Sequence, residues 1–162
     1  MKLKLTLATM IGAGLCAAFA AGISGCGENK QEQHQFSFAV FFSDNQIQGQ
    51  VTKAWAEEVE KRSGGRVKIN IHFGGSLRPA AQTYQSVVDG VCDMGMSCFA
   101  YNPGNFPLLE GLDLPLGYPD GKTATLVANE MLAKYQPKEV GGVRVLLLHA
   151  HGPGILATRE PI

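Results

Sequence analysis

The chain has 162 residues, 45% of them hydrophobic, and its 14 Lys and Arg balance its 14 Asp and Glu. A formal charge of zero, without a cluster of Lys and Arg, argues against a nucleic-acid-binding protein. The length allows one modest domain with its own core.

The N-terminus has the pattern of a bacterial lipoprotein export signal. A basic start leads into an apolar run, and Ser24 and Gly25 lie directly before Cys26. We expect residues 1–25 to be a cleaved signal peptide, Cys26 to carry the lipid, and residues 26–35 to form a polar tether. The mature protein would then be a periplasmic, membrane-anchored lipoprotein. An uncleaved membrane-spanning anchor and an ordinary signal peptide are the alternatives.

Strand and helix patterns alternate from residue 36 onward. Residues 36–42 form an apolar run that is typical of a buried strand. The spacing of Ser43 and Gln46 is that of a capping box, and it predicts a helix that ends at Gly64. Residues 67–73 alternate between apolar and polar, which predicts a strand with one wetter face. The predicted inner face of the helix consists of Ile47, Val51, Ala54, Trp55 and Val59.

The second half of the chain continues the alternation. Pro79 is placed to begin a helix, residues 92–97 predict a third strand, and residues 101–118 predict a packed irregular connection. Residues 143–148 predict another buried strand, and residues 155–158 begin a further extended segment. The order predicts an α/β fold with a mostly parallel sheet flanked by helices. Two helical faces complete the prediction: Tyr84, Val87, Val88 and Val91 on the first, then Ala124, Val127, Ala128, Met131, Leu132 and Tyr135 on a helix capped by Asp120.

The two cysteines of the predicted domain are expected to be free thiols. Cys92 and Cys98 lie six residues apart in an apparent strand. Six extended residues span roughly 20 Å, which is far beyond the reach of a disulfide.

Three loops follow strands of the predicted parallel sheet. Ligands of open α/β sheets lie beyond the carboxyl ends of the strands, so these loops hold the candidate ligand-binding residues. Helix capping by Ser43 and core packing of the aromatic residues are the competing interpretations. The candidates are Phe42 and Ser43 in the first loop, Ser97, Cys98, Phe99 and Tyr101 in the second, and His149 and His151 in the third.

The same residues give weak support for catalysis or metal binding. His149 and His151 form an H-x-H pair, but no third ligand is near in the sequence. The glycine-rich segment after His151 is not accompanied by a G-x-S-x-G nucleophile elbow. Ser97 and Cys98 have no adjacent base. We therefore expect no metal, no cofactor and no enzymatic activity.

Four segments, in matching order and spacing, resemble the solute-binding subunits of tripartite ATP-independent periplasmic (TRAP) transporters. The resemblance implies a lobe of the periplasmic binding protein type (type II-like). Family members are about twice as long as this chain. Their two α/β lobes close on a small organic acid, usually a carboxylate, and deliver it to a membrane permease. The segments are residues 55–67, 87–94, 101–108 and 112–115.

On this resemblance, residues 36–162 correspond to the first lobe, and the second lobe is missing. The three loops named above would line the cleft, and the arginine that clamps the carboxylate would lie beyond Ile162. Some relatives carry an arginine near the position of Gly154, so its absence here argues against a ligand like sialic acid.

The expected function is that of an extracytoplasmic solute receptor of a TRAP transporter, with a small organic acid and the permease subunits as partners. The alternatives are a solute-binding or sensor module of another uptake system, a periplasmic hydrolase that uses Ser97, Cys98 or His149, and a gene fragment without activity.

Overall fold

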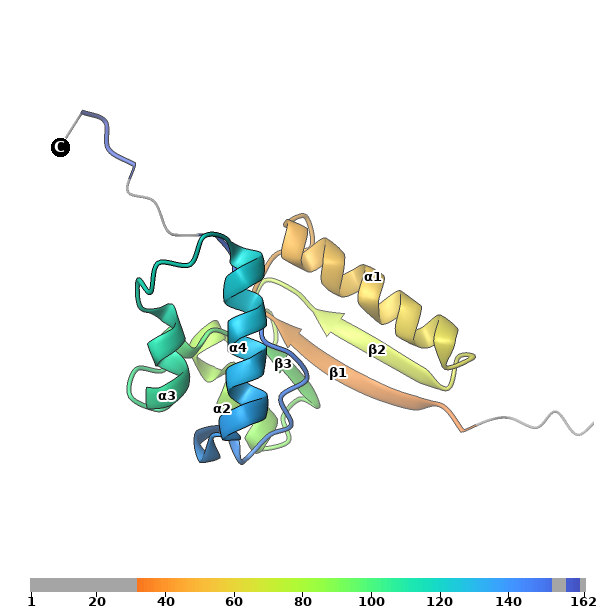
Figure 1. Ribbon diagram of the computed structural model, residues 1–162. Helices are drawn as coiled ribbons and strands as arrows, with labels where there is room; N and C mark the ends of the chain where they lie inside the picture. Colours follow the sequence, from red (N-terminus) through yellow and green to blue (C-terminus); the bar gives the residue numbers. More distant parts are fainter. Residues whose placement is uncertain (1–31, 153–156, 161–162) are drawn as a thin grey trace, which may run out of the picture. The chain divides into compact units, whose positions relative to one another are not determined.

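The computed structural model describes residues 32–152 and 157–160 (Figure 1). The predictions for the export signal and for lipidation of Cys26 lie outside the described residues, as does the beginning of the extended segment predicted at residues 155–158. Within the described part of the chain, no helix has both the length and the apolar character needed to span a membrane.

Three parallel strands form the sheet, in the order β2-β1-β3. They are β1 (His34–Val40), β2 (Val67–His72) and β3 (Met94–Met96). Among the three strands, the central strand β1 has the largest number of buried residues, because it has a neighbouring strand on either side. These residues are Phe38, Ala39 and Val40. Helix α1 lies along β1 and β2, whereas α2, α3 and α4 gather near β3 (Figure 1). This confirms the α/β fold with a parallel sheet flanked by helices.

Helix α1 (Ile47–Arg62) buries a different face from the predicted one. Its buried residues are Gly49, Thr52 and Ala56, while Ile47 and Val51 are 66% and 60% exposed. The small residues allow the helix axis to come close to its neighbours. A side chain at Gly49 would collide with the carbonyl oxygen of Ser43. Close approach by small residues therefore outweighed the larger hydrophobic stripe.

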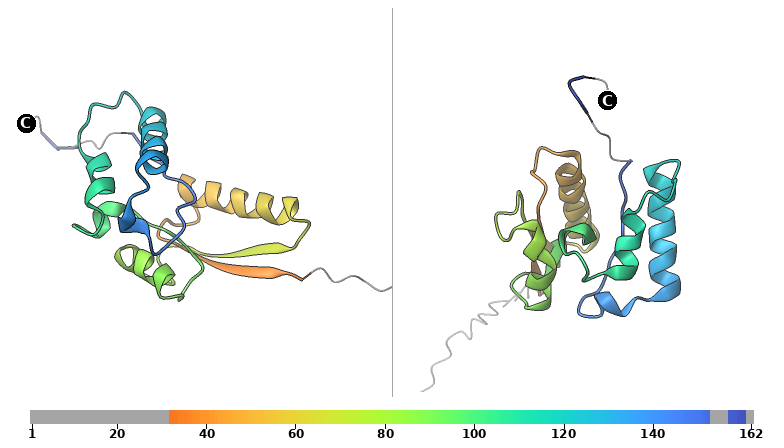
Figure 2. Two further views of the ribbon diagram at one scale, coloured as in Figure 1. Left: turned by 60° about the horizontal axis from the view of Figure 1, so that its bottom comes forward. Right: turned by 90° about the vertical axis from the view of Figure 1, so that its left-hand side faces the viewer.

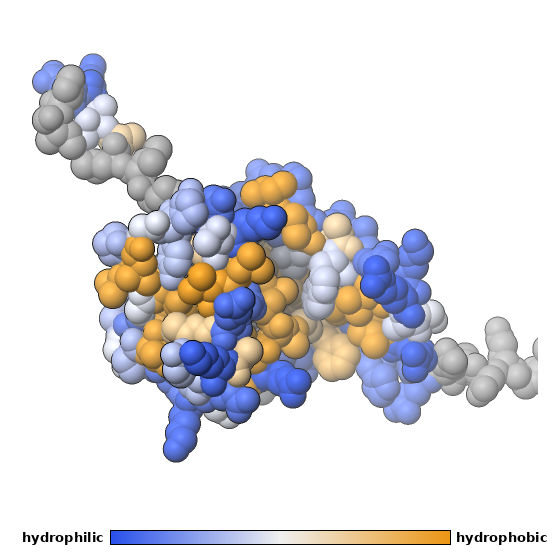
Figure 3. Space-filling model, viewed as in Figure 1, coloured by the Kyte–Doolittle hydropathy of each residue, from blue (hydrophilic) through white to orange (hydrophobic). Residues whose placement is uncertain are grey.

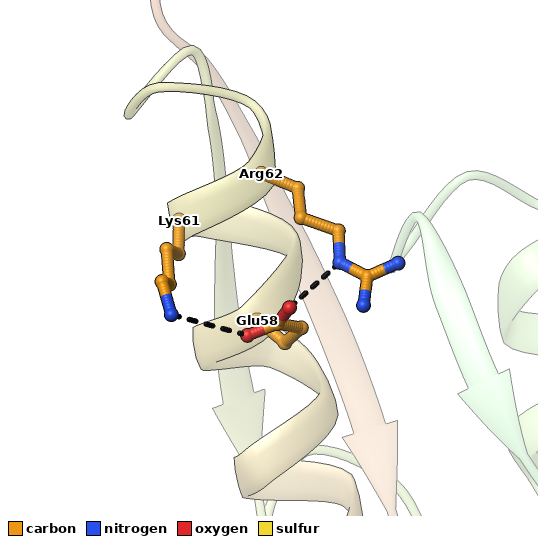
Figure 4. Close-up of polar contacts among 3 residues, drawn as sticks. All are labelled: Glu58, Lys61 and Arg62. Atoms are coloured by element: carbon orange, nitrogen blue, oxygen red, sulfur yellow. Dashed lines mark hydrogen bonds and ion pairs between the residues drawn. The ribbon is translucent and has the colours of Figure 1, made fainter.

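The C-terminal turn of α1 carries a small ion-pair cluster (Figure 4). Nε of Arg62 lies 2.7 Å from a carboxylate oxygen of Glu58, and Nζ of Lys61 lies 4.0 Å from the other. Pairs as exposed as these contribute roughly 0–1 kcal/mol each. The helix ends as predicted, because Gly64 adopts a positive φ of 64° that a side chain would disfavour.

The second helical segment also packs through small residues. It consists of the turn η1 (Ala80–Gln82) and α2 (Thr83–Val88), with Thr83 and Ser86 buried. The predicted inner residues Val88 and Val91 are exposed. On β3, a side chain at Gly95 would come within 2.6 Å of the Thr83 methyl group, so α2 and β3 are in close contact.

A polar connection joins β1 to the residue pair that precedes β3. The carboxylate of Asp93 accepts hydrogen bonds from the Ser37 amide at 2.7 Å and from the Ser37 hydroxyl at 2.8 Å. These bonds, the amide's first, hold the pKa of the Asp93 carboxyl below its ordinary value. Burial raises the pKa of the neighbouring Cys92 thiol, with a smaller contribution from the Asp93 charge. Cys92 and Cys98 are free thiols, as predicted.

The segment around residues 101–118 has more regular secondary structure than predicted. It contains short helical turns at η2 (Phe99–Tyr101), α3 (Pro107–Glu110) and η3 (Gly111–Asp113). The Glu139 carboxylate accepts the amides of Leu108 and Leu109 at the start of α3. The Glu110 carboxylate accepts the amides of Gly104 and Phe106. The amides of Leu108 and Leu109 lie in the first turn of α3 and have no partner within the helix, so the Glu139 carboxylate satisfies them.

Helix α4 (Gly121–Tyr135) begins as predicted, because Asp120 accepts the Thr123 amide at 2.7 Å. That bond holds the pKa of the Asp120 carboxyl below its ordinary value. Ala124 and Ala128 are buried in α4. The turn η4 (Lys138–Val140) follows the helix. The core of this region consists of Phe106, Leu109 and Val140, surrounded by Tyr84, Phe99, Leu112, Met131, Leu132, Val143, Val145 and Leu148.

The predicted strand at residues 143–148 is wrong. Within the described part of the chain the segment pairs with no strand, and it runs back along α4 (Figure 2). Asn129 of α4 accepts the Leu148 amide at 3.0 Å and donates to the Leu148 carbonyl at 2.6 Å. Leu146 and Leu147 are 67% and 64% exposed. Hydrophobic surface is also visible in Figure 3 in the region of α3 and α4.

Candidate functional site

The first predicted loop is fixed by backbone bonds at the end of β1. The Phe42 carbonyl accepts the Gly74 amide at 2.9 Å, and the Val40 carbonyl accepts the Gly75 amide at 3.1 Å. Ser43 is exposed, and its amide donates to Oε1 of Gln46 at 2.8 Å. Only this half of the predicted capping box is present, because the Gln46 amide donates to the Ser43 carbonyl oxygen at 3.1 Å and not to the Ser43 hydroxyl.

The second loop divides between the core and the surface. The Phe99 ring packs against Phe106 with centroids 5.2 Å apart, so Phe99 belongs to the core region. Ser97 is exposed, and its hydroxyl donates to the Ala80 carbonyl at 2.9 Å. Cys98 is half-buried. Tyr101 is 45% exposed and faces the first loop.

An aromatic cluster joins these two loops; we define it as Phe41, Phe42 and Tyr101. The Phe41 and Phe42 centroids are 4.0 Å apart with planes inclined by 33°. The Tyr101 ring meets Phe41 edge-on, at 5.4 Å and 86°. The cluster therefore lies beyond the carboxyl ends of adjacent parallel strands, where α/β proteins bind ligands. Sequence reasoning missed Phe41 because it was assigned to the interior of the first strand.

A small pocket lies beneath the second loop. Its volume of about 40 Å³ is close to that of one water molecule and too small for an organic acid. Nδ2 of Asn102 is buried and has no hydrogen-bond partner among the described residues. No hydrophobic or capping pattern in the sequence singles out Asn102. The pocket is lined by Tyr84, Ser97, Cys98, Phe99, Asn102 and Phe106.

The third loop is attached to α4. The Ala150 amide donates to Oγ1 of Thr125 at 2.9 Å, and Nδ1 of His151 lies 2.6 Å from the Gly152 carbonyl oxygen. His149 and His151 are both exposed. Across residues 32–152 and 157–160, no hydrogen bond or ring contact joins either histidine to the aromatic cluster, to Ser43 or to Ser97. The structure therefore brings two of the three loops together and places the third along a helix.

Neither chemical alternative gains support from the geometry. The Ser97 hydroxyl donates to a backbone carbonyl, and in the described residues it makes no bond to a histidine or carboxylate that could act as a base. No group of three His, Cys, Asp or Glu side chains within the described ranges could hold a metal ion.

A hollow of about 300 Å³ lies between α1 and β2, and it reaches the first loop at Asp44. Ala56, Ile69, Ile71 and Phe73 supply apolar walls. Three carboxylates, of Asp44, Glu57 and Glu60, line it together with one amine, of Lys53. An excess of negative charge disfavours an anionic ligand.

Known proteins match most of the chain that follows its N-terminal segment. The profile of the bacterial extracellular solute-binding proteins, family 7, matches residues 38–156. A solute-binding protein of Verminephrobacter eiseniae is 28% identical over 101 residues, which are 59% of this chain and 30% of that protein.

Two solved structures are similar in sequence and fold. A TRAP periplasmic solute-binding protein of Desulfovibrio salexigens is 36% identical with a TM-score of 0.61, over 65% of this chain and 33% of its own. A TRAP solute-binding protein of Rhodoferax ferrireducens, in complex with copurified benzoate, is 27% identical with a TM-score of 0.70, over 75% and 38%. The matched part of the chain thus spans about a third of the length of these proteins.

Proposed function

Because the chain belongs to the bacterial extracellular solute-binding proteins of family 7, we propose that it forms one wall of a receptor that captures a small organic acid outside the cytoplasm. Residues 36–162 are the first of two lobes, and a permease of the TRAP type receives the ligand. The benzoate in the Rhodoferax ferrireducens protein supports an organic acid as the ligand class.

The observation that carries this proposal is the meeting of two loops at the carboxyl end of the sheet. The aromatic cluster joins segments about 60 residues apart in sequence, directly beyond β1 and β3. Its rings are partly open to solvent, and so is the hydroxyl of Ser97 nearby in the same loop. A ligand held by this wall and by a second lobe would stabilise the closed state through its higher affinity for that state. Binding of this kind breaks no covalent bond, so the protein is a receptor and not an enzyme.

The anchor is a separate part of the proposal. The sequence around Cys26 supports cleavage before this residue and lipidation of its thiol, which would hold the receptor at a membrane surface. Cys26→Ala is expected to leave an unprocessed precursor without lipid, as measured by metabolic labelling with a fatty acid. Cys16→Ala, within the apolar run, is the matched control and should be processed normally. Labelling that survives Cys26→Ala would contradict the anchor.

Thermal unfolding tests the receptor function. The protein, at the length that its gene encodes, is heated with each member of a panel of small carboxylic acids and with the corresponding primary amides. At least one acid should raise Tm in proportion to its binding, because only the folded state binds it. The amides should not, because they lack the charge that a clamping arginine recognises. Equal shifts by acids and amides, or none from any acid, would refute the proposal.

A further inference from the structure

We propose that the aromatic cluster selects an aromatic carboxylate over an aliphatic one; this inference rests on the receptor function proposed above. The cluster consists of Phe41, Phe42 and Tyr101, and it is the part of the candidate site at which two loops meet. Its occupant is an acid whose own ring stacks on, or meets edge-on, the rings of this wall.

The wall is built in a fixed geometry. Phe41 and Phe42 are consecutive residues, yet their rings lie on the same side, with centroids 4.0 Å apart. Strand β1 ends at Val40, so the alternation of side chains between the two faces of the sheet does not continue through these residues. The amides of Gly74 and Gly75 hold the carbonyls of Phe42 and Val40. These bonds fix the backbone that carries the Phe41 and Phe42 rings, which reduces the entropic cost of ordering this wall on binding.

The third ring is partly free to contact a ligand. Tyr101 touches Phe41 with its edge at 5.4 Å and is still 45% exposed. Phe41 and Phe42 are half-buried. By contrast, Phe99 packs on Phe106 in the core. The chain thus separates one aromatic residue that packs in the core from three that are partly exposed beyond the carboxyl ends of β1 and β3.

Ring geometry, and not apolar area alone, should decide the preference. Aromatic pairs attract through their quadrupoles in edge-on or offset arrangements, which adds to the effect of burial. A saturated ring of the same size buries a similar apolar area but lacks this quadrupole attraction. Benzoate and cyclohexanecarboxylate form a matched pair that isolates it. We expect benzoate to bind about two- to tenfold more tightly.

Calorimetry with these two acids and with succinate tests the inference on the protein at its natural length. Phe42→Leu and Tyr101→Leu should each reduce the preference for benzoate toward unity, while Tyr101→Phe should retain it. Tyr135→Leu, on the exposed end of α4, is the control and should leave the preference unchanged. Circular dichroism establishes that each variant is folded, and having two leucine variants keeps the test valid if one is not.

The outcomes separate the two claims. A preference for benzoate that both ring deletions reduce supports the inference. Tighter binding of cyclohexanecarboxylate or succinate, or a preference for benzoate that survives both deletions, overturns the inference and leaves the receptor function in place. Absence of binding by every organic acid of the thermal panel overturns the receptor function, and the inference with it.

Discussion

Gly49 shows how strongly a single residue positions α1. Its missing side chain makes room for the Ser43 carbonyl oxygen, so Gly49→Ala forces the loop after β1 away from the helix. Alanine favours a helix by up to about 1 kcal/mol over glycine, but overpacking costs roughly 1–3 kcal/mol. We expect a net loss of about 1–2 kcal/mol in the free energy of unfolding by urea.

Gly111→Ala is the matched control for that variant. No heavy atom would lie within 4 Å of the new side chain, and φ is −59°, which alanine accepts. Its stability should change by less than about 0.5 kcal/mol. A larger loss in Gly111→Ala than in Gly49→Ala would contradict the close contact at α1.

Asp93 makes the stability of the sheet depend on pH. Its pKa in the folded state is lower than the ordinary value of 3.8, because the ionised form accepts the bonds from Ser37. The contribution of Asp93 to the free energy of unfolding is therefore complete above about pH 4, and it is lost as the pH drops through the lower pKa of the folded state. Because the carboxylate is exposed, solvent limits the effect to about 1 kcal/mol.

Asp93→Asn tests this dependence by urea unfolding at several pH values. The variant should be less stable than the wild type at pH 7, and the difference should narrow below pH 4 as the wild type loses its charge. Asp113→Asn, which alters an exposed carboxylate on η3, should have little effect at pH 7. A difference for Asp93→Asn that is constant from pH 7 to pH 2.5 would show that the charge is not what matters.

Among the secondary-structure elements, the segment after η4 depends most on a single side chain. The Asn129 side chain forms hydrogen bonds with both the amide and the carbonyl of Leu148. In Asn129→Ala these two groups would form hydrogen bonds with water instead. Loss of two bonds should speed hydrogen exchange of the Leu148 amide about tenfold or more, with little change in the sheet. Exchange measured by mass spectrometry on residues 144–152 would detect this. Glu130→Ala, one residue along the same helix, should leave exchange as it was.

Periodic patterns were sufficient to predict most elements but not their inner faces. The helices at residues 47–62 and 121–135, the Asp120 cap and the strand at 67–72 were predictable, because each has a local signal. The buried side of α1 was not, because glycine and threonine at positions 49 and 52 carry no hydrophobic signal. The segment at 143–148 has the composition of a strand, and only tertiary contacts to α4 reveal its actual place.

The candidate site was predictable to a similar extent. The rule that ligands lie at the carboxyl ends of strands selected two loops that meet at one edge of the sheet, and ligand binding by these loops stays a prediction. It could not show that Phe99 packs inward, since neighbouring aromatic residues look alike in sequence. It could not show that Phe41 joins the cluster or that Asn102 is buried, because both depend on how distant segments fold together.

We proposed above that this lobe works together with a second one, and the exposed hydrophobic residues and the partly exposed aromatic cluster support that proposal. Exposed leucines and valines lie on α4 and on the segment after it, in a region where Figure 3 shows hydrophobic surface. Under the proposal, the aromatic cluster is one of two walls of the site. The proteins that match are about three times as long as the matched part. A ligand that touches one wall should bind weakly, since each loss of ~1.4 kcal/mol reduces affinity tenfold.

The most direct test of this account compares two lengths of the protein by calorimetry against a panel of small carboxylates. The first is residues 27–162, and the second is extended to the two-lobe length of the relatives. We expect the extended protein to bind an organic acid tightly and the short one to bind the same acid with at best millimolar affinity, because closure around the ligand needs both lobes. Micromolar or tighter binding by residues 27–162 alone would contradict it, because the site would then be complete within a single lobe.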